Sequence, residues 1–146
     1  GVQTCALPIS HTSVDGKEIA VASVHLSWWD KGFQFEWPRI EKYFSQVGKP
    51  FILAGDFNNP AGQEGYETIL SSSLELQDSF IEAKETKGTY TVGPEIDGWT
   101  DNQIPLRIDY VFASPEWDIQ RLYVIFDGEN KPNVSDHYGL EAELSL

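Results

Sequence analysis

The stretch that decides the fold is FILAGDFNNP, residues 51–60. Four apolar residues run into Gly55 and Asp56, and two asparagines and Pro60 follow shortly after. This order is typical of a buried strand that ends in a tight polar turn. An unpaired carboxylate at the end of a buried strand is costly. We therefore expect Asp56 to face other polar groups or a cation.

The segments before this stretch predict a hairpin and a helix. Residues 9–27 predict a hairpin around Asp15 and Gly16, with a second strand over 18–26 that is apolar on both faces and therefore central. Residues 37–50 predict a helix with Pro38 in its first turn and one apolar face, closed by Gly48 and Pro50.

The segments after it add a short helix and a cluster of strands. Residues 63–72 predict the helix, and the strands are predicted over 106–114, 119–127 and 139–146. The last strand alternates apolar and acidic residues, so one of its faces should be exposed to solvent. The turn-rich residues 88–105 predict a long loop, which in a compact domain is often functional. This order of predicted helices and strands along the chain favours a mixed α/β sandwich.

Polar side chains stand at four predicted strand ends. They are His25, Asp56 with Asn58, Asp109, and Asp136 with His137. Each alone has an ordinary structural explanation, such as a hydrogen-bonded core histidine or a turn-forming aspartate. Buried polar groups need partners, however, so these side chains should meet one another or a cation. Taken together they predict a catalytic or metal-binding site.

Four motifs in order resemble one family. They are SVHLS (23–27), GDFNNP (55–60), RIDYVF (107–112) and SDHYGL (135–140). The chain from Ser10 to Leu146 resembles the C-terminal portion of the endonuclease/exonuclease/phosphatase superfamily, the deoxyribonuclease I-like enzymes. HLSWWDKGFQFEW, IDGW and VSDHYGLEAEL are most similar to bacterial sugar-phosphate phosphatases, including maltose 6'-phosphate phosphatase. The implied fold is α/β, the C-terminal half of a four-layer α/β sandwich with two mixed sheets flanked by helices.

The resemblance also implies a reaction and roles. The reaction is metal-dependent hydrolysis of a phosphoester, with Mg²⁺ or Mn²⁺ as the cofactor and Asp136 helping to hold it. Asp56 and Asn58 would orient or deprotonate the attacking water, and His25 and His137 would donate hydrogen bonds to phosphoryl oxygens. Asp109 would hydrogen-bond His137 and fix its tautomer. The identity of the general base stays open at this point.

The start of the chain leads us to expect a partial domain. The chain contains no methionine, and GVQTCALPI resembles a translated sequencing-adapter oligonucleotide, so we expect residues 1–9, including Cys5, to be a non-native leader. Residues 10–146 would then be a partial domain. Family members carry an earlier Asn and a metal-binding Glu, and nothing before His25 supplies them. We therefore expect the chain on its own to be inactive.

Composition bears on substrate and partners. With 10 Lys and Arg against 23 Asp and Glu, the chain carries a formal net charge of −13, which argues against nucleic acid as a partner. No apolar run is long enough for a membrane span. We expect a small phosphorylated sugar as substrate and a cytoplasmic location, with no expectation for the oligomeric state.

Alternatives to the phosphomonoesterase are kept open. They are a metal-dependent endo- or exonuclease, a sphingomyelinase-like phosphodiesterase acting on lipid head groups, and a non-catalytic binding module. Three tryptophans outside the predicted core could contact substrate by stacking on a sugar ring. These substrate-binding candidates are Trp28, Trp29 and Trp99.

Overall fold

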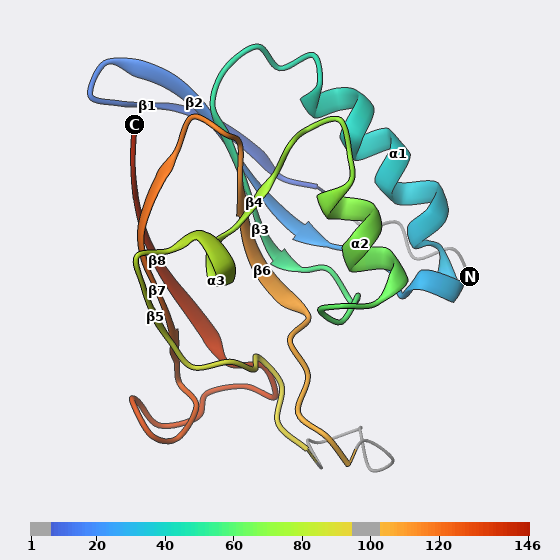
Figure 1. Ribbon diagram of the computed structural model, residues 1–146, viewed down its shortest axis with the longest axis vertical. Helices are drawn as coiled ribbons and strands as arrows, with labels where there is room; N and C mark the ends of the chain where they lie inside the picture. Colours follow the sequence, from blue (N-terminus) through green and yellow to red (C-terminus); the bar gives the residue numbers. More distant parts are fainter. Residues whose placement is uncertain (1–6, 95–102) are drawn as a thin grey trace.

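The computed structural model describes residues 7–94 and 103–146 and consists of two mixed sheets, with two helices on one face of the larger sheet and a short third helix against strands of both sheets (Figure 1). The five-stranded sheet has the order β1 (Ile9–Val14), β2 (Lys17–His25), β3 (Phe51–Asp56), β6 (Asp109–Ala113), β4 (Gln77–Asp78). The three-stranded sheet has the order β5 (Glu85–Lys87), β7 (Asp118–Ile125), β8 (Gly139–Ser145). The helices α1 (Phe33–Phe44) and α2 (Glu64–Leu70) cover one face of the larger sheet, and the smaller sheet lies on its other side (Figure 1). Helix, sheet and sheet thus form three layers in the described part of the chain.

The first half of the chain builds a hairpin and a crossover. β1 (Ile9–Val14) pairs antiparallel with β2 (Lys17–His25), and Asp15 and Gly16 turn the chain with φ of 49° and 79°. β2 then pairs in parallel with β3 (Phe51–Asp56) after a crossover through α1 (Phe33–Phe44). β2 lies between two partners, which confirms its predicted central position. Ile9 belongs to the predicted leader and pairs with Ala22, while the origin of the leader stays a prediction.

The predicted start of α1 was wrong by one turn. The helix begins at Phe33, so Pro38 lies inside it. Phe33 and Trp37 are both fully buried, and their rings stack with centroids 6.1 Å apart. The apolar face therefore begins one turn earlier than Trp37, and its burial offsets the hydrogen bond that Pro38 cannot donate. The helix ends at Phe44, before the predicted closing residues Gly48 and Pro50.

The second half adds the remaining strands. A short helix, α2 (Glu64–Leu70), leads to β4 (Gln77–Asp78), α3 (Ser79–Glu82) and β5 (Glu85–Lys87). β6 (Asp109–Ala113) pairs antiparallel with β3, and β7 (Asp118–Ile125) pairs antiparallel with β8 (Gly139–Ser145). Between these segments Val92 and Leu106 bridge the two ends of the predicted loop, whose residues 95–102 lie outside the described residues.

Each strand of the larger sheet has two faces of different character. We call one the helix-covered face; it packs on α1 and α2 in one apolar core and carries Ala20, Ala22 and Val24 of β2, Phe51 and Leu53 of β3, and Tyr110 and Phe112 of β6. The opposite, inter-sheet face includes Val21, Ile52 and Ala113, which pack with Trp117, Ile119 and Leu144 of the second sheet region. Both faces of the larger sheet are therefore covered at this end, as expected for a central layer.

β8 confirms the predicted alternation. Glu141 and Glu143 are exposed, while Leu140, Ala142 and Leu144 are half-buried toward the larger sheet. Among residues 7–94 and 103–146, no helix is both long and apolar enough to cross a membrane.

Candidate active site

Strand register brings three of the predicted site residues into one row. His25 is the partner of Asp56 across β2 and β3, and Asp56 is the partner of Asp109 across β3 and β6. Register partners point to the same face of a sheet. These three side chains therefore end the inter-sheet face, two rows beyond the apolar Val21 and Ile52, at the edge where β2 and β3 finish.

His137 completes the row from another segment. It lies just before β8, and its Nδ1 is 2.9 Å and 3.1 Å from the two carboxylate oxygens of Asp109. Asp56, Asp109 and His137 each offer one atom to a group in which all such atoms lie within 4.8 Å of one another. Sequence positions far apart thus converge on one small polar site.

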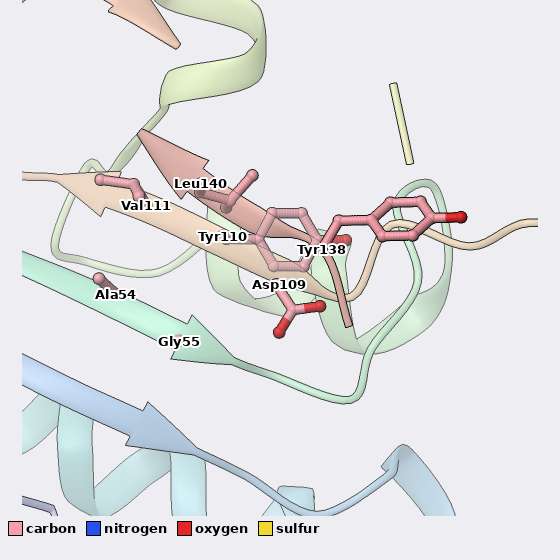
Figure 2. A pocket seen from close by; sticks show the side chains of 7 residues that line it. All are labelled: Ala54, Gly55, Asp109, Tyr110, Val111, Tyr138 and Leu140. Carbon is pink, nitrogen blue, oxygen red and sulfur yellow. The ribbon is translucent and has the colours of Figure 1, made fainter. Parts of the chain in front are cut away.

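A cavity of about 270 Å³ lies beside this site, between the two sheets (Figure 2). Figure 2 shows the Asp109 carboxylate beside the end of β3, with Tyr138 and Leu140 lining the cavity from the β8 side. Asp109 of the site is thus accessible from the space between the sheets.

Thr91 anchors both members of the histidine–aspartate pair, and sequence analysis missed it. Its hydroxyl oxygen accepts hydrogen bonds from the backbone N–H groups of Ile108 and Asp109, both at 3.1 Å, and its carbonyl accepts one from the N–H of Tyr138 at 2.7 Å. Thr91 is fully buried. It therefore ties the start of β6 to the segment that carries His137. A single threonine in a turn-rich loop has no sequence pattern that would mark this role.

The turn after β3 is fixed by its two asparagines. Asn58 adopts φ of 52°, its N–H donates to Asp56 Oδ1 at 2.8 Å, and its side-chain amide donates to the Leu26 carbonyl at 2.8 Å. The buried Asn59 donates its side-chain amide to the carbonyls of Phe57 and Ser27. These bonds join the ends of β2 and β3. They also leave Asn58 Oδ1 as the atom of that side chain available to accept a hydrogen bond.

A carboxylate clamp holds the segment after His25. Glu36 of α1 accepts one hydrogen bond from the backbone N–H of Ser27 at 2.7 Å and another from its hydroxyl at 2.8 Å. The clamp fixes the position from which Trp28 and Trp29 emerge. Sequence analysis missed it because the two partners only meet once α1 folds back on β2.

Carboxylates and imidazoles lie close together in the row, and each affects the pKa of its neighbours. Burial, and then the nearby charge of Asp109, raise the pKa of Asp56 above its usual value, although the Asn58 N–H acts in the opposite direction. The hydrogen bond that His137 donates to the Asp109 carboxylate raises the pKa of His137. The pair His137–Asp109 therefore favours the imidazolium form, while Asp56 is a better proton acceptor than an exposed aspartate.

The remaining predicted residues lie around this row. His25 is 61% exposed, with Nε2 3.6 Å from Asp56 Oδ2. Asp136 is exposed, accepts a hydrogen bond from the Ser135 hydroxyl, and stands outside the close group of Asp56, Asp109 and His137. Trp28 and Trp29 are half-buried on the other side of Asn58. Trp99 lies outside the described residues.

Comparison with known proteins gives one family. The sequence profile of the Endonuclease/Exonuclease/phosphatase family matches residues 5–137. An endonuclease/exonuclease/phosphatase family protein from Leptotrichia buccalis is 30% identical, with a TM-score of 0.74 over 94% of this chain and 53% of that chain. A search of curated proteins found no match.

Two further solved structures share the fold at lower identity. A mannosyl-6-phosphatase from Bacteroides thetaiotaomicron is 21% identical, with a TM-score of 0.64 over 90% of this chain and 53% of that chain. A beta toxin variant from Staphylococcus aureus with bound magnesium ions is 17% identical, with a TM-score of 0.70 over 92% and 56%. The chain spans about half the length of these structures. The predicted α/β fold with two mixed sheets is confirmed, and the chain belongs to the Endonuclease/Exonuclease/phosphatase family.

Proposed function

We propose that the full-length gene product is a divalent-metal-dependent phosphomonoesterase that acts on a small phosphorylated sugar. The observation that carries this proposal is the row of His25, Asp56 and Asp109 with His137 bonded to Asp109. Two imidazoles and several carboxylates lie together at one end of the larger sheet. They supply the hydrogen-bond donors and acceptors that phosphoryl transfer to water requires.

The donor set suits a hard divalent cation. Asp56 and Asp109 face each other across two strands, and adjacent carboxylates favour a bound cation. Carboxylate oxygens suit Mg²⁺ and Mn²⁺. We assign Asp136 as a residue that would hold the cation, which would supply charge neutralisation for the phosphoryl oxygens. Asp109 is assigned instead to fixing His137, because both of its oxygens lie within hydrogen-bonding distance of His137 Nδ1.

The chain's own residues would then accept protons from the water and donate hydrogen bonds to the phosphoryl oxygens. Asp56 takes a proton from the attacking water, a role that its raised pKa favours. Asn58 Oδ1 accepts the other water hydrogen, because the amide nitrogen already donates to Leu26. His137, held as imidazolium by Asp109, and His25 donate to phosphoryl oxygens.

The step balances as a simple hydrolysis. The water oxygen forms a new bond to phosphorus, and the bond from phosphorus to the sugar oxygen breaks. The proton that Asp56 accepts reaches the departing sugar oxygen through solvent, so the products are inorganic phosphate and the free sugar.

A sugar monophosphate is favoured over nucleic acid by charge and by one relative. The formal net charge of −13 repels a polyanion. One of the solved structures with this fold is described as a mannosyl-6-phosphatase, a name that applies to that protein and that we extend to this chain only as a proposal.

The test is phosphate release by the full-length gene product from mannose 6-phosphate and maltose 6'-phosphate, with Mg²⁺, Mn²⁺ or EDTA. We expect turnover with either cation and none with EDTA. His25→Ala and His137→Ala should each reduce turnover at least about a hundredfold, whereas His11→Ala, an exposed histidine of β1, should not. Equal turnover in EDTA would refute the metal requirement. Efficient plasmid nicking without phosphate release from either sugar would favour the nuclease.

A further inference from the structure

A second hollow opens at the same edge of the larger sheet, beside the proposed catalytic row. Its volume is about 160 Å³. Its walls are formed by Trp28, Trp29, Asp30, Asn58, Gln63 and Glu64. Asn58 is shared with the catalytic row, because its backbone N–H donates to Asp56. We call this hollow the tryptophan groove.

The floor of the tryptophan groove is rigid. It consists of Asn59, Pro60 and Gly65, all of them buried. A side-chain carbon on Gly65 would overlap the Asn59 amide, so only glycine allows α2 to approach this closely. The Asn59 amide is held in turn by the carbonyls of Phe57 and Ser27. A groove with such a floor is preformed, which lowers the entropic cost of binding.

The walls differ from one side to the other. Trp28 and Trp29 present half-buried aromatic surface, and the Trp29 ring is supported by Phe33 with ring centroids 5.8 Å apart. The polar side carries Asp30, Gln63 and Glu64, which are exposed and rich in hydrogen-bond acceptors. None of the described residues that line the groove is a lysine or an arginine.

We propose that the tryptophan groove binds the leaving group of the phosphoester and selects a neutral, polyhydroxylated ring. This inference rests on the proposed function, because the groove is a leaving-group site only if the phosphate lies at the catalytic row. Sugar hydroxyls donate hydrogen bonds to carboxylates, and the C–H face of a sugar ring packs on an aromatic ring. Both kinds of surface line one small hollow.

The same walls discriminate against a second phosphate. Glu64 would lie near any anion in the groove, and so would Asp30, whose carboxylate lies 3.6 Å from the Nζ of Lys31 outside the lining. Like charges at an interface disfavour the wrong partner and so supply specificity. Sugar bisphosphates, nucleotides and nucleic acids should therefore be poor substrates, because of the groove and not only because of the net charge.

The experiment compares three substrates of the full-length gene product that share one phosphate ester. Methyl phosphate has no ring, mannose 6-phosphate has a neutral ring, and fructose 1,6-bisphosphate has a ring with a second phosphate. Glu64→Gln and Trp28→Ala should each lower kcat/KM for mannose 6-phosphate about tenfold, the loss expected for one charge-assisted hydrogen bond or one aromatic contact. The value for methyl phosphate should change less than about twofold.

A variant that removes the two negative charges of the groove should improve activity on the bisphosphate relative to mannose 6-phosphate. Asp30→Asn combined with Glu64→Gln should raise the ratio of kcat/KM for the bisphosphate to that for mannose 6-phosphate several-fold, since removing like charges removes repulsion. Glu67→Gln on the same helix, outside the groove, should leave every ratio unchanged. Equal losses on methyl phosphate and mannose 6-phosphate, or an unchanged bisphosphate ratio, would overturn the proposal.

A binding measurement separates this inference from the proposed function. Saturation-transfer NMR with free mannose should show ring protons in contact with the protein, and Trp28→Ala should weaken the transfer. If the gene product releases no phosphate from any ester but binds mannose in this way, the proposed reaction fails and the sugar site stands. If it releases phosphate but mannose transfer is the same in Trp28→Ala, the sugar site fails alone.

Discussion

The two faces of the larger sheet are formed by the same three strands, β2, β3 and β6, but have different roles. On the helix-covered face, Leu53, Tyr110 and Phe112 are fully buried and surrounded by apolar groups. On the inter-sheet face, apolar residues such as Ile52 are replaced at one end of the sheet by the last residues of β2 and β3, His25 and Asp56, and by the first residue of β6, Asp109. Because side chains alternate along a strand, a core residue and a site residue are sequence neighbours throughout. Neighbouring substitutions should therefore have effects of different kinds.

The largest effect should come from the helix-covered face. Phe112→Ala removes a fully buried ring that contacts Phe57 edge-on at 4.9 Å and stacks on Tyr110 at 4.9 Å. Deleting such a ring leaves a cavity and should lower the free energy of unfolding by about 3–5 kcal/mol. Urea unfolding of the full-length gene product would measure this change. A loss below about 1 kcal/mol would show that the helix-covered face is not the principal core.

The inter-sheet row should give losses of activity without such losses of stability. Asp109→Asn and His137→Ala should each reduce kcat by about 10²–10³-fold, because a hydrogen-bonded pair acts as one catalytic unit. The double variant should lose little more than either single variant. Its kcat and its unfolding midpoint would be measured together. A double loss equal to the product of the single losses would separate the two residues.

Thr91 should give a smaller, mixed effect, because it supports the row without touching substrate. Thr91→Val keeps the shape but removes the hydroxyl that accepts from Ile108 and Asp109, so two buried N–H groups lose their acceptor. We expect a loss of about 1–3 kcal/mol in stability and a fall in kcat. Thr91→Ser keeps the hydroxyl and should restore kcat. A valine variant with wild-type kcat would assign Thr91 to stability alone.

The sequence could predict the strands and the site residues because both leave local patterns. The apolar run before Asp56 and the order of the four motifs predicted the fold and the polar strand ends, and the structure brings Asp56, Asp109 and His137 within reach of one another. Features that depend on distant partners left no such pattern. The start of α1 at Phe33 depends on burial by the sheet, and the contacts of Thr91 depend on a loop that meets two other segments.

A buried ion pair on the helix side is a second case of this kind. Asp78 accepts hydrogen bonds from Arg107 at 2.8 Å and from the Tyr66 hydroxyl at 2.7 Å, and all of these partners come from different elements. Neither Asp78 nor Arg107 stands out in sequence. Strand register and loop closure decide such contacts, and one sequence does not encode register as a local signal.

The smallest effect concerns protons and cations on the inter-sheet row. Burial and Asp109 raise the pKa of Asp56, so the folded state holds this proton to higher pH than the unfolded state does. The contribution to stability is therefore present below the unfolded pKa and is lost as pH rises through the raised pKa. A nearby divalent cation favours the ionised form of Asp56 over the protonated form, so it should stabilise the fold more at neutral pH than at acidic pH. At ten times its Kd the cation contributes about 1.4 kcal/mol, an increase of a few degrees in Tm.

Thermal unfolding with Mg²⁺, with Mn²⁺ and with EDTA at several pH values would measure this increment. Asp56→Asn removes the titrating group and should make the remaining increment less dependent on pH. Asp118→Asn, an exposed carboxylate paired with Lys84, offers a matched control and should leave the pH dependence of the increment unchanged. If the increment in the wild type were the same at pH 5 and pH 7, the cation would not compete with the Asp56 proton. The polar end of the inter-sheet face would then lack the feature that most distinguishes it from the helix-covered face, a half-buried carboxylate whose ionised form a cation stabilises.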